Sequence, residues 1–324
     1  MKQIVMTGPK KSEVREVETV KPTADQILIR TKYVGVCMSE HFEWTVAKEG
    51  QVFGHEPMGI VAEVGKNVTG FAVGDRISGL WGGGMTEYVV ADPKHDVIVK
   101  LPESVRDEDL VLEPLACLFS AVSKVRIPII GATVCVVGAG YMGCGAISLL
   151  KMRGARVVAI DIHPASLEDA KRYGADEVYL VEEAKEKFCI NPWDGVNGFD
   201  VVMEWAESDE SLDLAINLTN MCGQLCVGAY HTGGKRLVDM QQLNVKAIEC
   251  LSVHPREHHL NVQGVYNSAA LLANGQWNYK DMPVKIFPRN KFDEAQAGFE
   301  TKHGKYMKAL VDMTMEDGEP YIVG

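Results

Sequence analysis

The chain has 324 residues, a hydrophobic content of 46% and a net charge of −11, values typical of a water-soluble protein with one large domain or two. The acidic balance argues against nucleic acid or an anionic membrane surface as the main partner. No apolar run approaches the ~20 residues of a membrane span and the N-terminal segment lacks the apolar core of a signal peptide, so we predict a cytoplasmic protein with no membrane partner.

The first third of the chain consists of short apolar runs separated by glycine turns, a pattern typical of a β-rich, barrel-like unit. The expected strands span residues 26–33, 59–64, 75–79, 85–91 and 96–100. Residues 107–125 have helical periodicity and lead from this unit into the next one.

The stretch from Thr133 to Asp161 contains a complete nucleotide-binding pattern. An apolar β-branched run at 134–137 predicts a buried strand, and it is followed by the glycine turn 138–143, a helix, and a second strand at 156–160. An acid then stands about 20 residues after the turn, where a dinucleotide site needs it. This order favours a dinucleotide site over an ordinary glycine-rich turn.

Each residue of this pattern has an expected physical role. Gly138 permits the tight turn, Gly140 lets the backbone approach a pyrophosphate, and Gly143 lets the helix pack on the strand. Asp161 is expected to accept hydrogen bonds from the ribose hydroxyls and to repel a 2′-phosphate, and no Arg occurs at 162–165, so NAD is favoured over NADP. The predicted cofactor-binding residues are Gly138, Ala139, Gly140, Tyr141, Met142, Gly143, Asp161 and Ile162.

Alternating strands and helices continue to about residue 255. Further strands are expected at 177–181, 200–205, 223–229 and 247–253, which gives six strands in a doubly wound parallel sheet. The remaining residues are too few for another layer of this kind, and we expect them to return to the first domain. The predicted site is the cleft between the two domains.

Three segments of the first unit carry candidate metal ligands. Cys37 and His55 lie in two of them, and Glu113 lies at the junction between the units. Cysteine, histidine and carboxylate are zinc ligands, but the spacing alone leaves a core thiol and a structural histidine as an open alternative. The other seven cysteines form no CxxC pair and are expected to be reduced thiols.

The segments GVCMSE, GHEPMGIVAEVGKNVTGFAVGDRI, LEPLACLFSAV and VVGAGYMG occur in an order that resembles the medium-chain dehydrogenase/reductase superfamily. The closest resemblance is to its zinc-dependent alcohol and polyol branch, which includes the sorbitol and threonine dehydrogenases. This resemblance implies α/β architecture, with a GroES-like catalytic domain at 1–115, a Rossmann domain at 116–256, and a return to the catalytic domain at 257–324. It also implies one catalytic zinc held by Cys37, His55 and Glu56, with Glu113 as a direct or water-mediated fourth partner, and Ser39 as proton relay.

Three departures from the family pattern stand out. The cysteine-rich lobe that often binds a structural zinc after GDR is absent, because no cysteine occurs between Cys37 and Cys117. A histidine often found five residues after the cysteine is replaced by Phe42, with His41 one position earlier, either lining the pocket or on the surface. Trp205 replaces a small residue and either packs on the cofactor or belongs to the core.

The anionic ligand set favours a polyol or sugar as substrate, oxidised by NAD to the ketone. Trp44 and Trp81 suit either a sugar ring or hydrophobic packing, and residues 254–259 are expected to form a solvated loop. The alternatives are a zinc-free reductase of the same fold, a lyase or epimerase that retains NAD, and a non-catalytic NAD-binding protein. The apolar edge strand at 247–253 predicts a homodimer, with a tetramer as the alternative.

Overall fold

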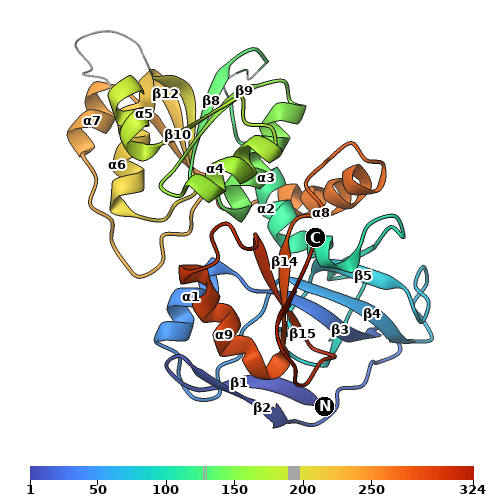
Figure 1. The fold of residues 1–324 in the computed structure, drawn as a ribbon. Coiled ribbons are helices and arrows are strands. Elements are labelled where there is room, and N and C mark those ends of the chain that lie inside the picture. The colour runs from blue at the N-terminus through green and yellow to red at the C-terminus, as the bar shows by residue number, and fades with distance from the viewer. Residues whose placement is uncertain (127, 129, 189–197) are drawn as a thin grey trace. The chain divides into compact units, whose positions relative to one another are not determined.

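The computed structural model describes residues 1–126, 128, 130–188 and 198–324 of the chain, which fold into two compact units (Figure 1). The first unit comprises Met1–Ala116, Val265–Gln276 and Lys280–Gly324. The second comprises Cys117–Gly264 and Trp277–Tyr279. The predicted combination of a β-rich unit with a doubly wound α/β unit is confirmed.

The first unit is built on a sheet in which C-terminal strands join strands from the start of the chain. Its strand order is β16-β14-β15-β3-β4-β5-β7, and β6 also pairs with β3. These strands are β3 (Ile27–Gly35), β4 (Pro57–Val64), β5 (Arg76–Leu80), β6 (Tyr88–Ala91), β7 (Val97–Lys100), β14 (Val284–Pro288), β15 (Lys308–Asp312) and β16 (Tyr321–Val323). The antiparallel pairing of β15 with β3 therefore places residues from the two ends of the sequence side by side.

A separate hairpin and short helices complete the first unit. The hairpin pairs β1 (Lys2–Gly8) with β2 (Lys11–Glu16). Helix α1 (Met38–Thr45) follows β3, and α9 (Phe292–Ala297) lies between β14 and β15 in the chain. A single hydrophobic cluster joins the hairpin to the later elements and includes Ile4, Trp44 and Phe292.

The second unit contains a six-stranded parallel sheet with the order β10-β9-β8-β11-β12-β13. This is the order of a doubly wound dinucleotide-binding fold. The strands are β8 (Thr133–Val137), β9 (Arg156–Asp161), β10 (Glu177–Leu180), β11 (Phe199–Glu204), β12 (Thr219–Val227) and β13 (Glu249–Ser252). The helices wholly within this unit are α3 (Tyr141–Met152), α4 (Pro164–Arg172), α5 (Val181–Phe188), α6 (Asp209–Leu218) and α7 (Met240–Val245). Helices α2 (Leu112–Ser123) and α8 (His258–Ala273) each contribute residues to both units.

Both faces of this sheet are covered, as its continuous apolar strands require. Val137 packs in a cluster with Ala184 of α5 and Leu214 of α6. Neighbouring Val136 points to the opposite face, where it lies next to Gly143 of α3. The alternation of side chains along β8 therefore places helices on both sides of the sheet.

Several elements were missed by the sequence analysis because their signals are weak. Helices α5 and α7 and strand β2 are short and polar, with several exposed positions, whereas strand β1 is short but has three buried apolar residues at its centre. The helix expected at 107–125 starts later, at Leu112. The solvated loop expected at 254–259 is partly wrong, because His258 and His259 begin α8.

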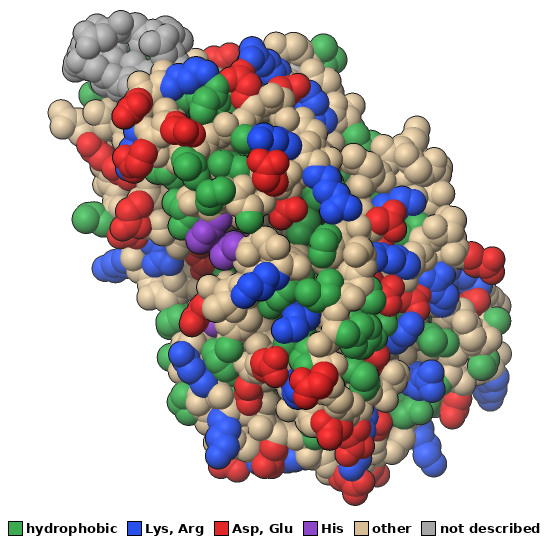
Figure 2. Space-filling view, viewed as in Figure 1, with side chains coloured by type: hydrophobic (Ala, Val, Ile, Leu, Met, Phe, Trp, Pro, Cys, Tyr) green, Lys and Arg blue, Asp and Glu red, His purple; other side chains and the backbone are tan. Residues whose placement is uncertain are grey.

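None of the helices in the described part of the chain is long and apolar enough to cross a membrane. The face of the molecule in Figure 2 carries acidic and basic side chains interspersed with hydrophobic ones. No continuous basic surface, of the kind that binds nucleic acid, occurs on that face of the described residues.

Candidate metal and nucleotide site

In the first unit, the candidate metal ligands lie where three adjacent strands of the sheet begin or end. The Gly35 backbone N–H, at the end of β3, donates to the carbonyl of Glu56, just before β4, over 2.9 Å. The Val36 N–H donates to the carbonyl of Ala309 in β15 over 3.0 Å. These two hydrogen bonds fix the segments before β4 and at the start of β15 against the residues that lead to Cys37.

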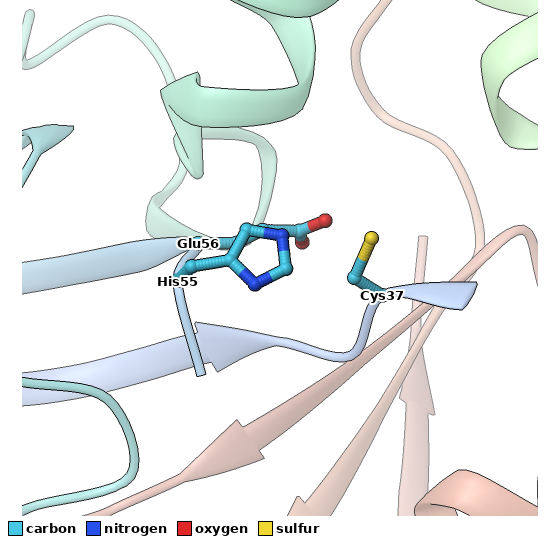
Figure 3. Close-up of side chains that lie close together, drawn as sticks. All are labelled: Cys37, His55 and Glu56. Carbon is cyan, nitrogen blue, oxygen red and sulfur yellow. The ribbon is translucent and has the colours of Figure 1, made fainter. Parts of the chain in front are cut away.

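This strand arrangement brings together the side chains of Cys37, His55 and Glu56, although Cys37 is distant in the sequence from the other two (Figure 3). One ligand atom from each lies within 4.8 Å of the others. Among the described residues, these three form the one group of three or more histidine, cysteine or carboxylate side chains placed in this way. The structure therefore brings together three of the four predicted ligands.

Glu113, the fourth predicted ligand, is placed near this group but is not part of it. It is the second residue of α2, and its negative charge contributes to raising the pKa of Lys308. Its carboxylate does not belong to the set of atoms that lie within 4.8 Å of one another. A water-mediated or more distant role suits this position better than direct contact with the same ion.

Glu40 orients His55 and was missed by the sequence analysis. The side chain of Glu40 is buried, and its Oε1 accepts hydrogen bonds from His55 Nδ1 and from the Gly54 backbone N–H, both over 2.7 Å. Because Nδ1 is used in this way, Nε2 is the His55 atom left to bind a metal. A carboxylate that fixes the ring of a histidine ligand is a recurring feature of metal sites.

Glu56 is held by a buried ion pair with Lys308, the first residue of β15. Lys308 Nζ and Glu56 Oε2 are 2.6 Å apart, and their side chains are 7% and 1% exposed. Burial acts to lower the pKa of Lys308, but the charges of Glu56 and Cys37 outweigh it and raise that pKa. A Cβ atom at Gly35 would lie only 1.8 Å from Glu56 Oε2, so the glycine makes room for the carboxylate.

Ser39 lies beside Cys37, the cysteine ligand of the group. Its hydroxyl donates a hydrogen bond to Cys37 Sγ over 3.2 Å. Burial, followed by the charge of Glu56, raises the pKa of the Cys37 thiol. Burial acts to lower the pKa of His55, but hydrogen bonds with Cys37 and Glu40 outweigh it and raise that pKa. A divalent cation would replace these protons, because metals bind the thiolate and the neutral imidazole.

The donor set fits zinc. Sulfur, imidazole nitrogen and carboxylate oxygen together are typical of catalytic zinc sites with three protein ligands and an open position. An alkaline-earth ion would prefer a shell of oxygen atoms. The side chains that surround the ligands supply the outer support such a site needs, through Glu40 and Lys308.

The neighbouring aromatic residues are structural. Trp44 is 4% exposed, its Nε1 donates to Asp293 Oδ1 over 2.7 Å, and its ring lies 5.5 Å from that of His41. Trp81 is 7% exposed and packs in a hydrophobic cluster with Ile77. Of the two interpretations given for these tryptophans, the structure supports hydrophobic packing.

In the second unit, the glycine turn has the geometry that its expected roles require. Gly138 has φ +90°, a left-handed conformation that favours glycine, and a Cβ there would meet the backbone of Trp205 at 2.9 Å. A Cβ at Gly143 would lie 1.8 Å from the carbonyl oxygen of Gly138, so only glycine lets α3 start this close to β8. A Cβ at Gly140 would meet nothing within 4 Å, which leaves open space beside this backbone.

Asp161 stands at the end of β9 and is tied to the glycine turn. Its Oδ2 accepts a hydrogen bond from the Ala139 N–H over 2.7 Å, and its Oδ1 accepts one from the His163 N–H over 2.8 Å. Each oxygen keeps a further lone pair for a ligand hydroxyl. Ile162, next to it, is 69% exposed and offers an apolar surface at the same edge of the sheet.

A second carboxylate, Glu204, is fully buried at the end of β11, beside the same turn. Its Oε1 accepts from the N–H groups of Ala206 and Glu207 and from the Ser211 hydroxyl, and its Oε2 bonds to His231 Nε2 over 2.9 Å. Burial acts to raise its pKa, but the hydrogen bonds and charge of His231, with those other donors, hold that pKa below the usual value. Trp205, the next residue, packs over Gly228 and is partly buried.

Comparison with known proteins identifies both halves of the chain. Residues 23–103 match the alcohol dehydrogenase GroES-like domain and residues 142–260 match the zinc-binding dehydrogenase family. A probable D-xylulose reductase A of Emericella nidulans is 26% identical over 93% of this chain and 92% of its own length. The sorbitol dehydrogenase of Bos taurus is 25% identical over 98% and 97%.

The fold is also similar to solved structures. L-idonate 5-dehydrogenase from Escherichia coli superposes with a TM-score of 0.80 at 21% sequence identity, covering 96% of this chain and 97% of that one. This likeness extends over both units described above.

We expect Glu40→Gln to weaken zinc binding by about 10- to 100-fold, because the amide no longer fixes the His55 ring as strongly as a carboxylate does. Competition with a chromophoric chelator measures the affinity. Glu43→Gln is the matched control, since Glu43 is exposed on the same helix. Equal zinc affinities for the two variants would contradict the role given to Glu40.

We expect Glu204→Gln to lower the free energy of unfolding by about 2 kcal/mol at pH 7, the usual worth of hydrogen bonds to a charged group. Because the folded pKa of Glu204 lies below the reference value of 4.5, its contribution is complete above that pH and is lost as the pH falls through the folded pKa. Thermal unfolding at a series of pH values should therefore show the variant and the parent converging below pH 4.5. Glu168→Gln, at an exposed position, should show no such difference.

Proposed function

Because the chain belongs to the zinc-binding alcohol dehydrogenases of the medium-chain dehydrogenase/reductase superfamily, we propose that it oxidises a secondary alcohol of a polyol or sugar to the ketone with NAD. The observation that carries this proposal is the group formed by Cys37, His55 and Glu56 in a chain that also has a dinucleotide-binding turn. The relatives named as a D-xylulose reductase and a sorbitol dehydrogenase, at 26% and 25% identity, support a polyol as the substrate. The enzyme is thus an oxidoreductase that uses zinc and a nicotinamide nucleotide.

The first unit would bind and orient the substrate. When bound, zinc acts as a Lewis acid that lowers the pKa of a coordinated hydroxyl, and the nicotinamide accepts the hydride. Cys37, His55 and Glu56 would hold the metal, with Glu113 as a distant partner. Glu40 holds the ring of His55 and Lys308 holds the carboxylate of Glu56, so neither ligand needs to reorganise.

Ser39 is the proposed first proton acceptor. Its hydroxyl lies 3.2 Å from Cys37 Sγ, at the metal group itself. A serine hydroxyl both accepts and donates hydrogen bonds, so Ser39 Oγ would take the substrate proton and pass its own proton to solvent.

The second unit would bind NAD. The Gly138–Gly143 turn, with Ala139, Tyr141 and Met142, presents the start of α3 to the pyrophosphate, where backbone N–H groups and the helix dipole favour a negative charge. Asp161 would accept from the adenosine ribose hydroxyls, with Ile162 beside the adenine. The clear space next to Gly140 supports this placement.

The proposal also covers the cellular compartment and the oligomeric state of the protein. None of the seven cysteines in the described part of the chain forms a disulfide with another of them, which supports a reducing compartment such as the cytoplasm. Strand β13 lies at the edge of its sheet, and Glu249, Cys250 and Ser252 are exposed. An unpaired edge strand is a template for pairing with another copy, so we place a homodimer contact there.

The first experiment is the zinc content and activity of the purified protein. We expect about one zinc per chain and NAD-linked oxidation within a panel of alditols. Cys37→Ala should lose the zinc and lower turnover at least about 100-fold, since metal polarisation supplies several kcal/mol, while NADH binding persists. Cys222→Ala, at an exposed position, is the matched control. A folded, NADH-binding protein with no zinc would overturn the zinc mechanism.

A second test concerns the coenzyme. Asp161→Ser removes the carboxylate that repels a 2′-phosphate, and like-charge repulsion is worth several kcal/mol. The ratio of kcat/KM for NADP to that for NAD should therefore rise at least about 10-fold. An unchanged ratio would show that Asp161 does not face the ribose.

A further inference from the structure

A second lysine, Lys302, lies close to the metal-ligand group and forms no ion pair with an acidic side chain of the described residues. It stands in the segment between α9 and β15, and its side chain is partly buried. Its Nζ donates to the carbonyl of Met307 over 3.3 Å and lies 4.8 Å from the centre of the Phe299 ring. Among the ion pairs of the described residues, none involves Lys302.

These contacts place Lys302 between two parts of the site. On one side, Phe299 lies edge-on to the His41 ring at 5.5 Å, and His41 belongs to α1, which begins directly after Cys37. On the other side, Met307 precedes Lys308, which is paired with Glu56. The ammonium group of Lys302 therefore lies between the segment that follows Cys37 and the segment whose Lys308 is paired with Glu56.

The electrostatics agree with this placement. Burial and the positive charge of Lys308 lower the pKa of Lys302 to about 8, against the opposing effects of Cys37 and Glu56. Lys308 differs, because its pKa is raised by the adjacent Glu56. Burying a cation without a directly paired counter-ion is unfavourable, and within the described residues Lys302 has only the more distant charges of Cys37 and Glu56 to offset its own.

A polar contact is also missing nearby. The Nδ1 atom of His41 is buried and has no hydrogen-bond partner among the described residues. Its ring is held between Trp44 and Phe299. A polar ligand next to Phe299 and Lys302 would lie at the edge of this ring.

We propose that Lys302 binds the carboxylate of a polyhydroxy monocarboxylic acid, an aldonate, whose hydroxyl is oxidised at the metal-ligand group. This inference rests on the proposed function and narrows its substrate class. A single ammonium group balances the single negative charge of a carboxylate, whereas phosphate sites usually combine several donors, such as an Arg fork or a helix N-terminus. Lys302 is thus a substrate-positioning residue, distinct from Lys308, which positions Glu56.

The test uses pairs of substrates that differ only at one end, an aldonate and its matching alditol, such as gluconate with sorbitol and idonate with iditol. We expect the zinc-loaded enzyme to have a higher kcat/KM for an aldonate than for its alditol. Lys302→Met should reduce that preference about 10- to 100-fold, the worth of a charge-assisted hydrogen bond, mainly through KM. Lys302→Arg should restore most of it.

Binding is measured independently of turnover, by calorimetric titration of the aldonate into the zinc-loaded protein with NADH. Lys302→Met should weaken this binding by a similar factor. Lys305→Met is the matched control, because Lys305 is exposed in the same segment and should leave both readouts unchanged. Zinc content and the thermal unfolding midpoint of each variant establish that the site is intact.

The outcomes separate the two proposals. Oxidation of alditols without any preference for aldonates, or an equal effect of Lys302→Met on both members of a pair, would overturn the role of Lys302 and leave the proposed function standing. Stronger binding of sugar phosphates than of aldonates would also overturn it. If the zinc-loaded enzyme oxidises no alcohol of either class, the proposed function itself fails.

Discussion

The buried ion pair between Glu56 and Lys308 is the interaction on which the site depends. It joins a residue just before β4 to the first residue of β15, and strand β3 runs between those two strands in the sheet. A buried ion pair gains little net free energy, but removing one partner typically costs about 3–5 kcal/mol because it leaves a buried charge. The pair therefore fixes a carboxylate ligand and at the same time attaches the C-terminal strands to the start of the chain.

The same need for balanced charge explains the other side chains around the metal ligands. Glu40 is buried and is compensated by His55 and by the Gly54 N–H. Glu56 is compensated by Lys308. Lys302 is the member of the group that forms no ion pair with another described residue, and it is the proposed contact for a charged substrate. The ligands, their supports and the proposed specificity residue thus follow from one requirement, that charges removed from water be paired.

The nucleotide unit depends on close packing of backbone. The turn at Gly138–Gly143 brings α3 so near to β8 that a side chain at Gly143 would overlap the Gly138 carbonyl oxygen. Asp161 and Glu204, at the carboxyl ends of the two strands next to β8, then accept hydrogen bonds from N–H groups of the glycine turn and of the segment after β11. These two carboxylates stiffen the edge of the sheet where a dinucleotide binds in doubly wound folds.

The sequence by itself determined the parts whose chemistry is local. The strand, glycine turn, helix and acid from Thr133 to Asp161 occur within one continuous segment, so their periodicity and spacing predicted their structure. Cys37, His55 and Glu56 were predicted from residue type and family resemblance, and the fold class followed from the alternation of strands and helices. Short polar elements such as α5 and α7 were missed, because they bury too little apolar surface to produce a clear pattern. Only the tertiary structure paired Lys308 with Glu56 and placed Lys302 near the metal ligands, because β15 reaches the segment of Cys37 through pairing with β3, and no local pattern records which distant strand will lie alongside another.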